Sequence, residues 1–211
     1  MKKKAVAVVM TAVMALGMVS AVSVQAGIED KTLIVGFDAE YPPYGYMDEN
    51  GEYTGFDLEL AQAVCDLEGW ELEKKPINWD SKDMELNSGS IDCIWNGFTM
   101  NGREDDYTFS EPYVDNSQVI VVADDSGIEK LTDLAGKTVG VQAASAALDL
   151  LQSEEEGGQK ELADTFGALN EFADYNTAFT ELQAGALDAL AIDVGVAKYQ
   201  LKFQRRGIQD P

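Results

Sequence analysis

Histidine is absent from this 211-residue sequence, and cysteine occurs only twice. Without histidine, the commonest zinc sites and histidine-based acid/base catalysis are excluded. Two cysteines are also too few for a disulfide scaffold or a four-thiolate metal site. Because the sequence contains no phosphate- or nucleotide-binding motif either, it predicts a protein that holds neither a metal ion nor another cofactor.

Basic residues are scarce: Lys and Arg number 15 against 38 Asp and Glu, and the formal net charge is -23. Nucleic acids and anionic membrane surfaces would repel such a chain. We interpret the acidic residues as a solvated surface. The apolar content of 45% and the aromatic content of 9% are typical of a packed globular protein, so extensive disorder is not expected.

A long apolar run lies near the N-terminus. It covers residues 5–19, follows three lysines at 2–4, and precedes small residues that end at Ala26. This is the pattern of a secretory signal peptide, so we expect residues 1–26 to be removed and the mature protein to be extracytoplasmic. A transmembrane anchor is the alternative, but the run is short for one. No cysteine lies near the expected cleavage point, which argues against a lipid anchor.

Strand and helix patterns alternate along the mature chain. The predicted strands are 32–37, 71–77, 91–95, 118–123, 138–141, 171–175 and 187–192, and the predicted helices are 56–67, 84–87, 146–151, 178–184 and 194–203. Asn50 and Gly51 are typical of a hairpin turn. The alternation indicates two α/β units with parallel sheets. We expect a first lobe at residues 27–118, a hinge strand at 119–123 and a second lobe at 124–211.

Four segments carry a resemblance to a known family. They are residues 36–44 with 55–58, residues 91–99 with Arg103 and 109–113, residues 131–142, and residues 185–193. Each segment alone is a weak signal, but together their order and spacing cover nearly all of the mature chain. In these segments the sequence resembles the amino-acid-binding proteins of ABC importers, the polar amino-acid family of extracytoplasmic solute receptors. The resemblance implies a two-lobed, periplasmic-binding-protein-like α/β fold of type II, which closes on one amino acid.

The resemblance also implies which residues hold the main chain of that amino acid. An Arg at the position of Arg103 holds the ligand carboxylate, and its planar guanidinium matches a carboxylate with two hydrogen bonds. An Asp at the position of Asp193, directly after a buried strand, receives the ammonium. The backbone of Gly97 and the hydroxyl of Thr99 complete this set.

Other positions implied by the resemblance surround the ligand side chain. Aromatic residues at the positions of Tyr41 and Trp79 sandwich it, and Asp38 lies at its far end, which hints at a polar or basic side chain. The second lobe contributes a loop whose backbone N–H groups favour the ligand carboxylate. Gln142, Ser145 and Ala146 fall in this loop, which the resemblance implies touches the ligand.

The sequence departs from the family pattern in three places. The family usually has one more residue between Thr99 and Arg103, although Gly102 relaxes the backbone there. A Gly-Thr pair is more usual in the loop 142–145, where Ser145 keeps the hydroxyl but the missing Gly adds a Cβ near the ligand. The family also continues for several tens of residues beyond the Asp193 motif. We therefore expect a C-terminally truncated chain that lacks the second hinge strand.

Each candidate residue has a structural alternative. Arg103 could pair with Glu104 or Asp105 at the surface, and Asp193 and Ser145 could cap helices. Asp38 could brace its own loop, and Tyr41 and Trp79 could be core aromatics. Cys65 and Cys93 could form a disulfide after export, but we favour two buried thiols.

We expect a monomeric binding protein that captures a free amino acid and delivers it to the permease subunits of an ABC importer. It would have no nucleic-acid or metal partner. The alternative is an enzyme on the same fold, a dehydratase that acts on a prephenate-like acid. Its candidate acids are Asp38, Glu40 and Asp193, but nothing pairs them with an obvious base. A sensor domain of a signalling receptor is disfavoured, because the sequence contains no second membrane span or output domain.

Overall fold

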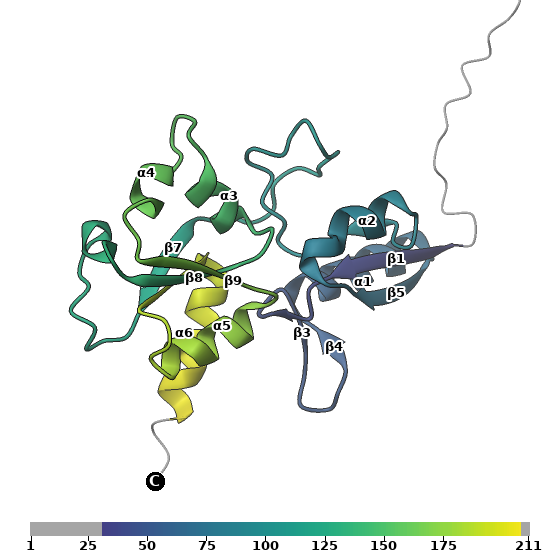
Figure 1. Cartoon of the computed structure of the whole chain (residues 1–211). Helices are drawn as coiled ribbons and strands as arrows, with labels where there is room; N and C mark the ends of the chain where they lie inside the picture. The colour runs from purple at the N-terminus through teal and green to yellow at the C-terminus, as the bar shows by residue number, and fades with distance from the viewer. Residues whose placement is uncertain (1–30, 208–211) are drawn as a thin grey trace, which may run out of the picture.

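The computed structural model of the protein describes residues 31–207, which form two α/β lobes that lie side by side (Figure 1). The expected signal peptide, residues 1–26, lies outside these residues. In the part of the chain that the structure describes, no helix is both long enough and apolar enough to span a membrane.

The first lobe is built on a parallel sheet of three strands. β1 (Thr32–Phe37) lies between β5 (Glu71–Pro76) and β6 (Cys93–Ile94). The connections contain α1 (Phe56–Glu68), the 3-10 helix η1 (Trp79–Ser81) and α2 (Lys82–Asn87). Apolar residues of β1 and α1 form one buried cluster, which contains Leu33, Val35, Phe37, Leu58, Ala61 and Cys65. The sheet is thereby held against α1.

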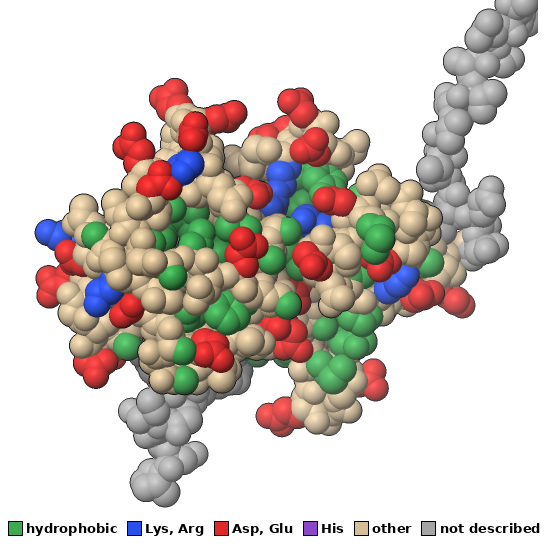
Figure 2. Space-filling view, viewed as in Figure 1, with side chains coloured by type: hydrophobic (Ala, Val, Ile, Leu, Met, Phe, Trp, Pro, Cys, Tyr) green, Lys and Arg blue, Asp and Glu red, His purple; other side chains and the backbone are tan. Residues whose placement is uncertain are grey.

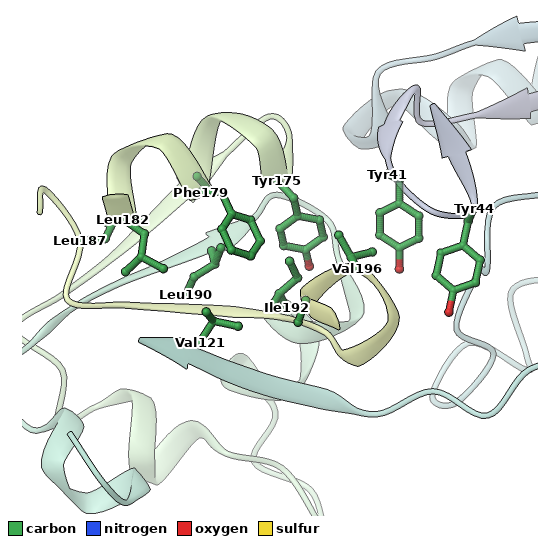
Figure 3. Close-up of a cluster of buried hydrophobic side chains, with 12 residues drawn as sticks. Tyr41, Tyr44, Val121, Tyr175, Phe179, Leu182, Leu187, Leu190, Ile192 and Val196 are labelled. Atoms are coloured by element: carbon green, nitrogen blue, oxygen red, sulfur yellow. The ribbon is translucent and has the colours of Figure 1, made fainter. Parts of the chain in front are cut away.

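A small antiparallel sheet extends from the first lobe. β2 (Glu40–Tyr41) pairs with β3 (Gly45–Met47), which pairs with β4 (Tyr53–Thr54). As predicted, Asn50 and Gly51 lie in the turn between β3 and β4. β2 and the turn after it place Tyr41 and Tyr44 in one buried cluster with residues of the second lobe (Figure 3).

The second lobe is built on a four-stranded sheet with the order β7-β10-β8-β9. Its strands are β7 (Gln118–Val122), β8 (Thr138–Gln142), β9 (Ala168–Phe172) and β10 (Ala189–Asp193), and only β7 is antiparallel to its neighbour. The helices are η2 (Leu131–Leu134), α3 (Ala146–Gln152), α4 (Lys160–Ala163), α5 (Tyr175–Gln183) and α6 (Val194–Gly207).

β10 is the centre of the second lobe, and all five of its residues are buried. Leu190 and Ile192 belong to one buried cluster, whereas Ala189 and Ala191 belong to another. Because alternate residues of a strand face opposite sides, β10 is covered on both faces of the sheet. Its carboxyl end therefore has a fixed position, and Asp193 lies there.

The two lobes with parallel sheets agree with the predicted fold class, but one strand prediction was wrong. Residues 171–175 were expected to form a strand, whereas β9 ends at Phe172 and Tyr175 begins α5. The Asp174 carboxylate accepts a hydrogen bond from the Thr177 N–H at 2.7 Å and caps α5, which explains the difference. The lobe boundaries and the hinge role of residues 119–123 remain predictions.

Cys65 and Cys93 are both free thiols, as favoured from the sequence. Cys65 is buried and Cys93 is half-buried. Burial raises the pKa of the Cys93 thiol to about 11. Both residues belong to the packing of the first lobe around β1 and α1.

Candidate functional site

The two lobes meet where their parallel strands end. Asp38 follows β1, whereas Gln142 and Asp193 are the last residues of β8 and β10. In open α/β sheets, ligands bind outside the carboxyl ends of the strands, so these three side chains lie where a ligand is expected. Nε2 of Gln142 donates to Oδ2 of Asp38 at 2.6 Å and joins the two lobes across this edge.

A small cavity lies between the lobes. Asn96 and Phe98 line it together with nine of the ten predicted ligand-binding residues, which are Tyr41, Trp79, Gly97, Thr99, Arg103, Gln142, Ser145, Ala146 and Asp193. Asp38, the tenth, does not line the cavity itself, but it accepts a hydrogen bond from Gln142, which does. The cavity volume is about 10 Å³, which is room for about one water molecule. An amino acid therefore fits only after the lobes move apart, a hinge motion that two-lobed proteins commonly make.

Arg103 reaches the cavity from a tight turn of the first lobe. Its N–H donates to the carbonyl oxygen of Met100 at 2.9 Å, and Gly102 has a φ of 78°, which glycine adopts without strain. The short loop therefore still directs the guanidinium inward, and Arg103 is only 8% exposed. The expected alternative, a surface pair with Glu104 or Asp105, is wrong because Arg103 pairs instead with a residue of the second lobe.

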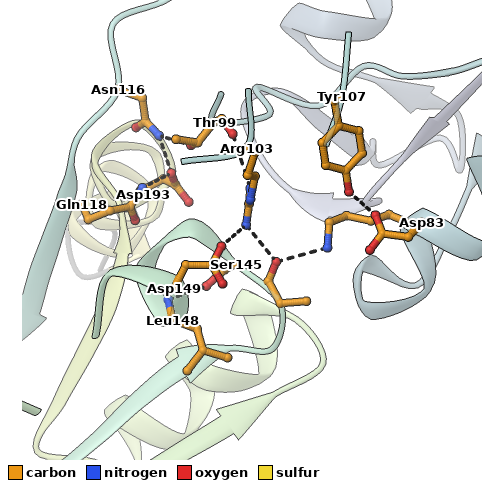
Figure 4. Close-up of polar contacts among 12 residues, drawn as sticks. Asp83, Thr99, Arg103, Tyr107, Asn116, Gln118, Ser145, Leu148, Asp149 and Asp193 are labelled. Atoms are coloured by element: carbon orange, nitrogen blue, oxygen red, sulfur yellow. Dashed lines mark hydrogen bonds and ion pairs between the residues drawn. The ribbon is translucent and has the colours of Figure 1, made fainter. Parts of the chain in front are cut away.

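The guanidinium of Arg103 crosses to the second lobe (Figure 4). Nη2 lies 2.6 Å from Oδ2 of Asp149 and 3.3 Å from the carbonyl oxygen of Ala144. Nη1 lies 3.4 Å from the carbonyl oxygen of Thr99, and the guanidinium carbon lies 4.8 Å from the ring centroid of Phe98. Asp149 lies in the first turn of α3, and the sequence analysis predicted no role for it at the site. Its carboxylate already forms an ion pair with the Arg103 guanidinium.

Asp193 is held by two side-chain amides. Its Oδ1 accepts hydrogen bonds from Asn116 and from Gln118, the latter at 2.7 Å. Asn116 also donates to Oγ1 of Thr99 at 3.3 Å and so links two of the predicted ligand-binding residues. The sequence analysis missed both amides, although the antiparallel pairing of β7 with β10 puts Gln118 directly opposite Asp193.

Tyr41 and Trp79 are both buried in the cavity wall. Tyr41 stacks on Tyr44 at a centroid distance of 5.4 Å. The rings of Trp79 and Phe98 are T-shaped at a centroid distance of 5.3 Å, and the Lys82 ammonium lies 5.3 Å from the Trp79 centroid. Since each ring is fixed by its own aromatic neighbour, the cavity has two aromatic walls that are held in place before a ligand enters.

Asp38 is a buried carboxyl group that is only 5% exposed. Burial raises the pKa of Asp38 to about 6; hydrogen bonds from the Glu40 N–H and the Gln142 side chain oppose the rise, and the charges of Asp174 and Glu40 add to it. The Glu40 N–H donates to Oδ1 of Asp38 at 2.8 Å, so Asp38 also braces its own loop, as the structural alternative expected. The neighbouring acids make this end of the cleft attractive to a cation.

The loop between β8 and α3 has an unusual backbone at Ala144. Its φ is 53°, a left-handed value that costs a residue with a Cβ roughly 1–2 kcal/mol. The carbonyl oxygen of Ala144 accepts hydrogen bonds from Arg103 and Lys82 of the first lobe, both at 3.3 Å. Oγ of Ser145 accepts a hydrogen bond from the Leu148 N–H at 3.2 Å, which confirms that Ser145 caps α3. The absence of the glycine that is more usual in this loop therefore strains the backbone at Ala144, in addition to placing a Cβ near the ligand.

Acidic side chains are spread over both lobes, and basic side chains are few on the face shown in Figure 2. Among residues 31–207, no group of three or more His, Cys, Asp or Glu side chains is arranged to hold a metal ion. The chemistry of the site is thus that of one buried guanidinium, two buried carboxyl groups and aromatic walls.

Comparison with known proteins gives the family. The model of the bacterial extracellular solute-binding proteins, family 3, matches residues 33–203. The L-cystine-binding protein TcyJ of Escherichia coli K12 is 32% identical over 193 residues, covering 86% of this chain and 69% of that protein. The arginine-binding extracellular protein ArtP of Bacillus subtilis is 35% identical over 174 residues, covering 82% of this chain and 65% of that protein. The chain thus matches only part of the length of each relative.

Solved structures of amino-acid-binding proteins have the same fold. A substrate-binding protein of an ABC uptake transporter from Streptococcus pneumoniae, with bound histidine, is 35% identical with a TM-score of 0.77, covering 82% of this chain and 70% of its own. An ancestral arginine-binding protein bound to arginine is 38% identical with a TM-score of 0.73, covering 83% and 75%. The ancestral amino acid-binding protein AncCDT-1, a precursor of cyclohexadienyl dehydratase, is 32% identical with a TM-score of 0.75, covering 82% and 75%. These similarities confirm the predicted two-lobed type II fold.

Proposed function

Because the chain belongs to family 3 of the bacterial extracellular solute-binding proteins, the amino-acid-binding proteins of ABC importers, we propose that its cleft binds one α-amino acid with a cationic side chain. The protein would act outside the cytoplasm, as a monomer, and deliver this ligand to the permease subunits of an importer. The observation that carries the proposal is that the buried side chains of Arg103 and Asp193 line one small cavity between the lobes.

The main chain of an amino acid matches these two groups. Its carboxylate would bind Arg103 and its ammonium would bind Asp193, with Gly97 and Thr99 completing the contacts. Hydrogen bonds to charged groups contribute about 1.5–3 kcal/mol each, and a micromolar complex needs about 8 kcal/mol in total. Two paired charges and the aromatic walls of Tyr41 and Trp79 reach that total.

A cationic side chain matches the other end of the cleft. Asp38 is buried there without a cationic partner within 4.0 Å among the described residues, and the charges of Asp174 and Glu40 add to its field. A guanidinium or ammonium group would relieve the cost of the buried charge on Asp38. The similarity to proteins described as arginine-binding supports the same ligand class.

The dehydratase alternative is not supported. The named relatives are binding proteins rather than enzymes, and AncCDT-1 is itself described as an amino acid-binding protein. Two of the acids that a dehydratase could use in this chain already have amide partners. Asp38 accepts a hydrogen bond from the side chain of Gln142. Asp193 accepts one from the side chain of Gln118. We therefore assign the chain a binding function.

The proposal is tested by thermal unfolding of the purified protein with each of the twenty amino acids and with ornithine. At about 100 times its dissociation constant, a ligand stabilises the folded state by about 2.7 kcal/mol. For a domain of this size, the unfolding midpoint should rise by roughly 5–10 °C. We expect arginine, lysine or ornithine to give the largest shift.

The variant Arg103→Met serves as the control for binding in the cleft. It should unfold cooperatively but lose the shift, because the ligand carboxylate then has no cation. A cooperative transition of the wild-type protein that no amino acid moves would contradict the proposal. A shift that Arg103→Met retains would contradict the assigned site but not amino-acid binding itself.

A further inference from the structure

Tyr44 is a buried aromatic residue of the first lobe that lies outside the ligand-binding set described so far. It is 7% exposed, and its ring stacks on that of Tyr41 at an interplanar angle of 28° (Figure 3). Its N–H donates to the carbonyl oxygen of Tyr41 at 3.0 Å, and its own carbonyl oxygen accepts from the Asp57 N–H, also at 3.0 Å. Both the ring and the backbone of Tyr44 are therefore fixed within the first lobe.

The two ends of the Tyr44 side chain each lie against a glycine. A Cβ placed on Gly97 would lie 3.4 Å from Cγ of Tyr44, at the near end of the ring. A Cβ placed on Gly195 would clash with the hydroxyl oxygen and would lie only 2.9 Å from Cζ and Cε2, at the far end. Since carbon atoms in contact normally lie about 3.5–4.0 Å apart, the backbone of Gly195 approaches Tyr44 as closely as a residue without a Cβ allows.

These two glycines belong to opposite sides of the proposed ammonium site. Gly97 lines the cavity from the first lobe. Gly195 is the second residue of α6 and follows Asp193, which lines the cavity from the second lobe, by two positions. The Tyr44 ring thus lies between the two chain segments that together would hold the ligand ammonium.

The second-lobe side of this contact is also fixed. The Val194 N–H donates to the carbonyl oxygen of Ser117 at 2.9 Å, which ties the start of α6 to the segment before β7. Burial raises the pKa of Tyr44, and the charges of Asp193 and Asp57 add to the rise, so the phenol stays protonated in the field of Asp193. The distance between the Gly97 segment and Asp193 therefore depends on the length of one rigid side chain.

We propose that Tyr44 is a positioning residue, whose phenol ring separates Gly97 from Gly195 and so sets the distance at which Gly97 and Asp193 face the α-ammonium of one bound amino acid. This inference rests on the proposed amino-acid-binding function. Tyr44 itself does not contact the ligand in this arrangement. Because every α-amino acid carries the same ammonium group, Tyr44 affects the affinity for all ligands alike.

The variant Gly195→Ala tests this spacing. Its methyl group meets the Tyr44 hydroxyl, so the segment that carries Asp193 must move away from the first lobe. Affinity, measured by calorimetric titration, should fall about tenfold or more for every amino acid that the wild-type protein binds, as when one hydrogen bond to a charged group is lost. Alanine favours a helix more than glycine does, so the unfolding midpoint without ligand should stay the same or rise.

A second substitution separates the contact from a general effect on α6. Adding Tyr44→Phe to Gly195→Ala removes the hydroxyl that the new methyl group meets, so the double variant should bind at least about threefold more tightly than Gly195→Ala alone. The matched control adds Tyr53→Phe to Gly195→Ala instead. Tyr53 packs T-shaped against Phe37 at a centroid distance of 5.3 Å and does not line the cavity, so its hydroxyl should not matter.

Four results would overturn the inference. Gly195→Ala may bind as tightly as the wild-type protein, or its loss of affinity may persist when Tyr44→Phe is added, which would assign the loss to α6. A loss confined to ligands with one kind of side chain would contradict a role at the ammonium. A lower unfolding midpoint of ligand-free Gly195→Ala would show that the glycine serves folding instead. If the wild-type protein binds no amino acid, the proposed function itself fails, and this role of Tyr44 fails with it.

Discussion

Nη2 of Arg103 and Oδ2 of Asp149 lie 2.6 Å apart and join the two lobes by an ion pair. The guanidinium that we propose for the ligand carboxylate is therefore already paired with a carboxylate of the protein. The side chain of Asp149 is 57% exposed, whereas that of Arg103 is 10% exposed. A ligand carboxylate that enters the cleft can displace Asp149 into solvent while Arg103 stays in place.

We expect Asp149→Asn to strengthen ligand binding, because the ligand then no longer competes with an internal carboxylate. Partly exposed ion pairs contribute up to about 1 kcal/mol, so the dissociation constant should fall about two- to fivefold in a calorimetric titration. The matched control is Asp164→Asn, which breaks an exposed pair with Lys160 at 2.7 Å and should leave binding unchanged. Weaker binding by Asp149→Asn would mean that Asp149 orients Arg103 in the liganded protein, contrary to this account.

The affinity for a basic amino acid should depend on pH through Asp38. With its pKa at about 6, Asp38 is mostly ionised at pH 7 and mostly protonated at pH 5. A cationic side chain binds the ionised form, so the affinity should fall about tenfold between pH 7 and pH 5. Calorimetric titrations at a series of pH values measure this directly.

The variant Asp38→Asn separates the pH dependence caused by Asp38 from that caused by other titrating groups. Asp57 also has a pKa raised to about 6 by burial, but its Oδ1 accepts a hydrogen bond from Tyr113, which does not line the cavity. Asp38 instead accepts a hydrogen bond from Gln142, which does line it. Asp38→Asn should bind the basic ligand more weakly at pH 7 and lose the pH dependence between 5 and 7. A pH profile unchanged by the substitution would assign the dependence to another group.

The raised pKa of Asp38 makes the stability of the ligand-free protein change with pH in the opposite direction to ligand affinity. The pKa of Asp38 is higher in the folded protein than in the unfolded chain, so the folded protein binds this proton more tightly. The free energy of unfolding should therefore fall as the pH rises from about 4 to about 6. Urea unfolding at several pH values tests the sign, and Asp38→Asn should reduce the slope.

Replacing Ala144 by glycine should stabilise the protein. The left-handed φ of 53° costs alanine roughly 1–2 kcal/mol, and glycine avoids this while losing about 0.5–1 kcal/mol of chain entropy on folding. The net gain of about 0.5–1 kcal/mol should raise the unfolding midpoint by about 1–4 °C. The control is the neighbouring Ala143→Gly, where φ is not positive and the midpoint should fall. Equal effects of the two substitutions would contradict strain at Ala144.

Much of the fold follows from short apolar runs and helical spacing. β1, β8 and β10 were predicted within a residue or two, because buried parallel strands are nearly continuous apolar segments. The segment around Tyr175 was misread because Phe172 and Tyr175 suit a strand, whereas the capping carboxylate of Asp174 starts a helix there.

The candidate site was predicted more completely at the strand ends than in the contacts that join the lobes. Arg103 and Asp193 could be chosen from motif positions. By contrast, Asn116, Gln118 and Asp149 contact them only because chain segments far apart in sequence are brought together. A single sequence contains no periodic signal for such pairs. The strain at Ala144 is likewise invisible without coordinates, since nothing in the sequence fixes its φ.

The most direct test of the central claim is a calorimetric titration of the protein with L-arginine and L-lysine at pH 7. The account predicts saturable binding of one ligand per chain with at least micromolar affinity, about -8 kcal/mol, for one of them. Arg103→Lys, which keeps the charge but loses the planar fork, should weaken it at least tenfold. Saturable binding that Arg103→Lys leaves unchanged, or no saturable binding of either ligand, would contradict the account.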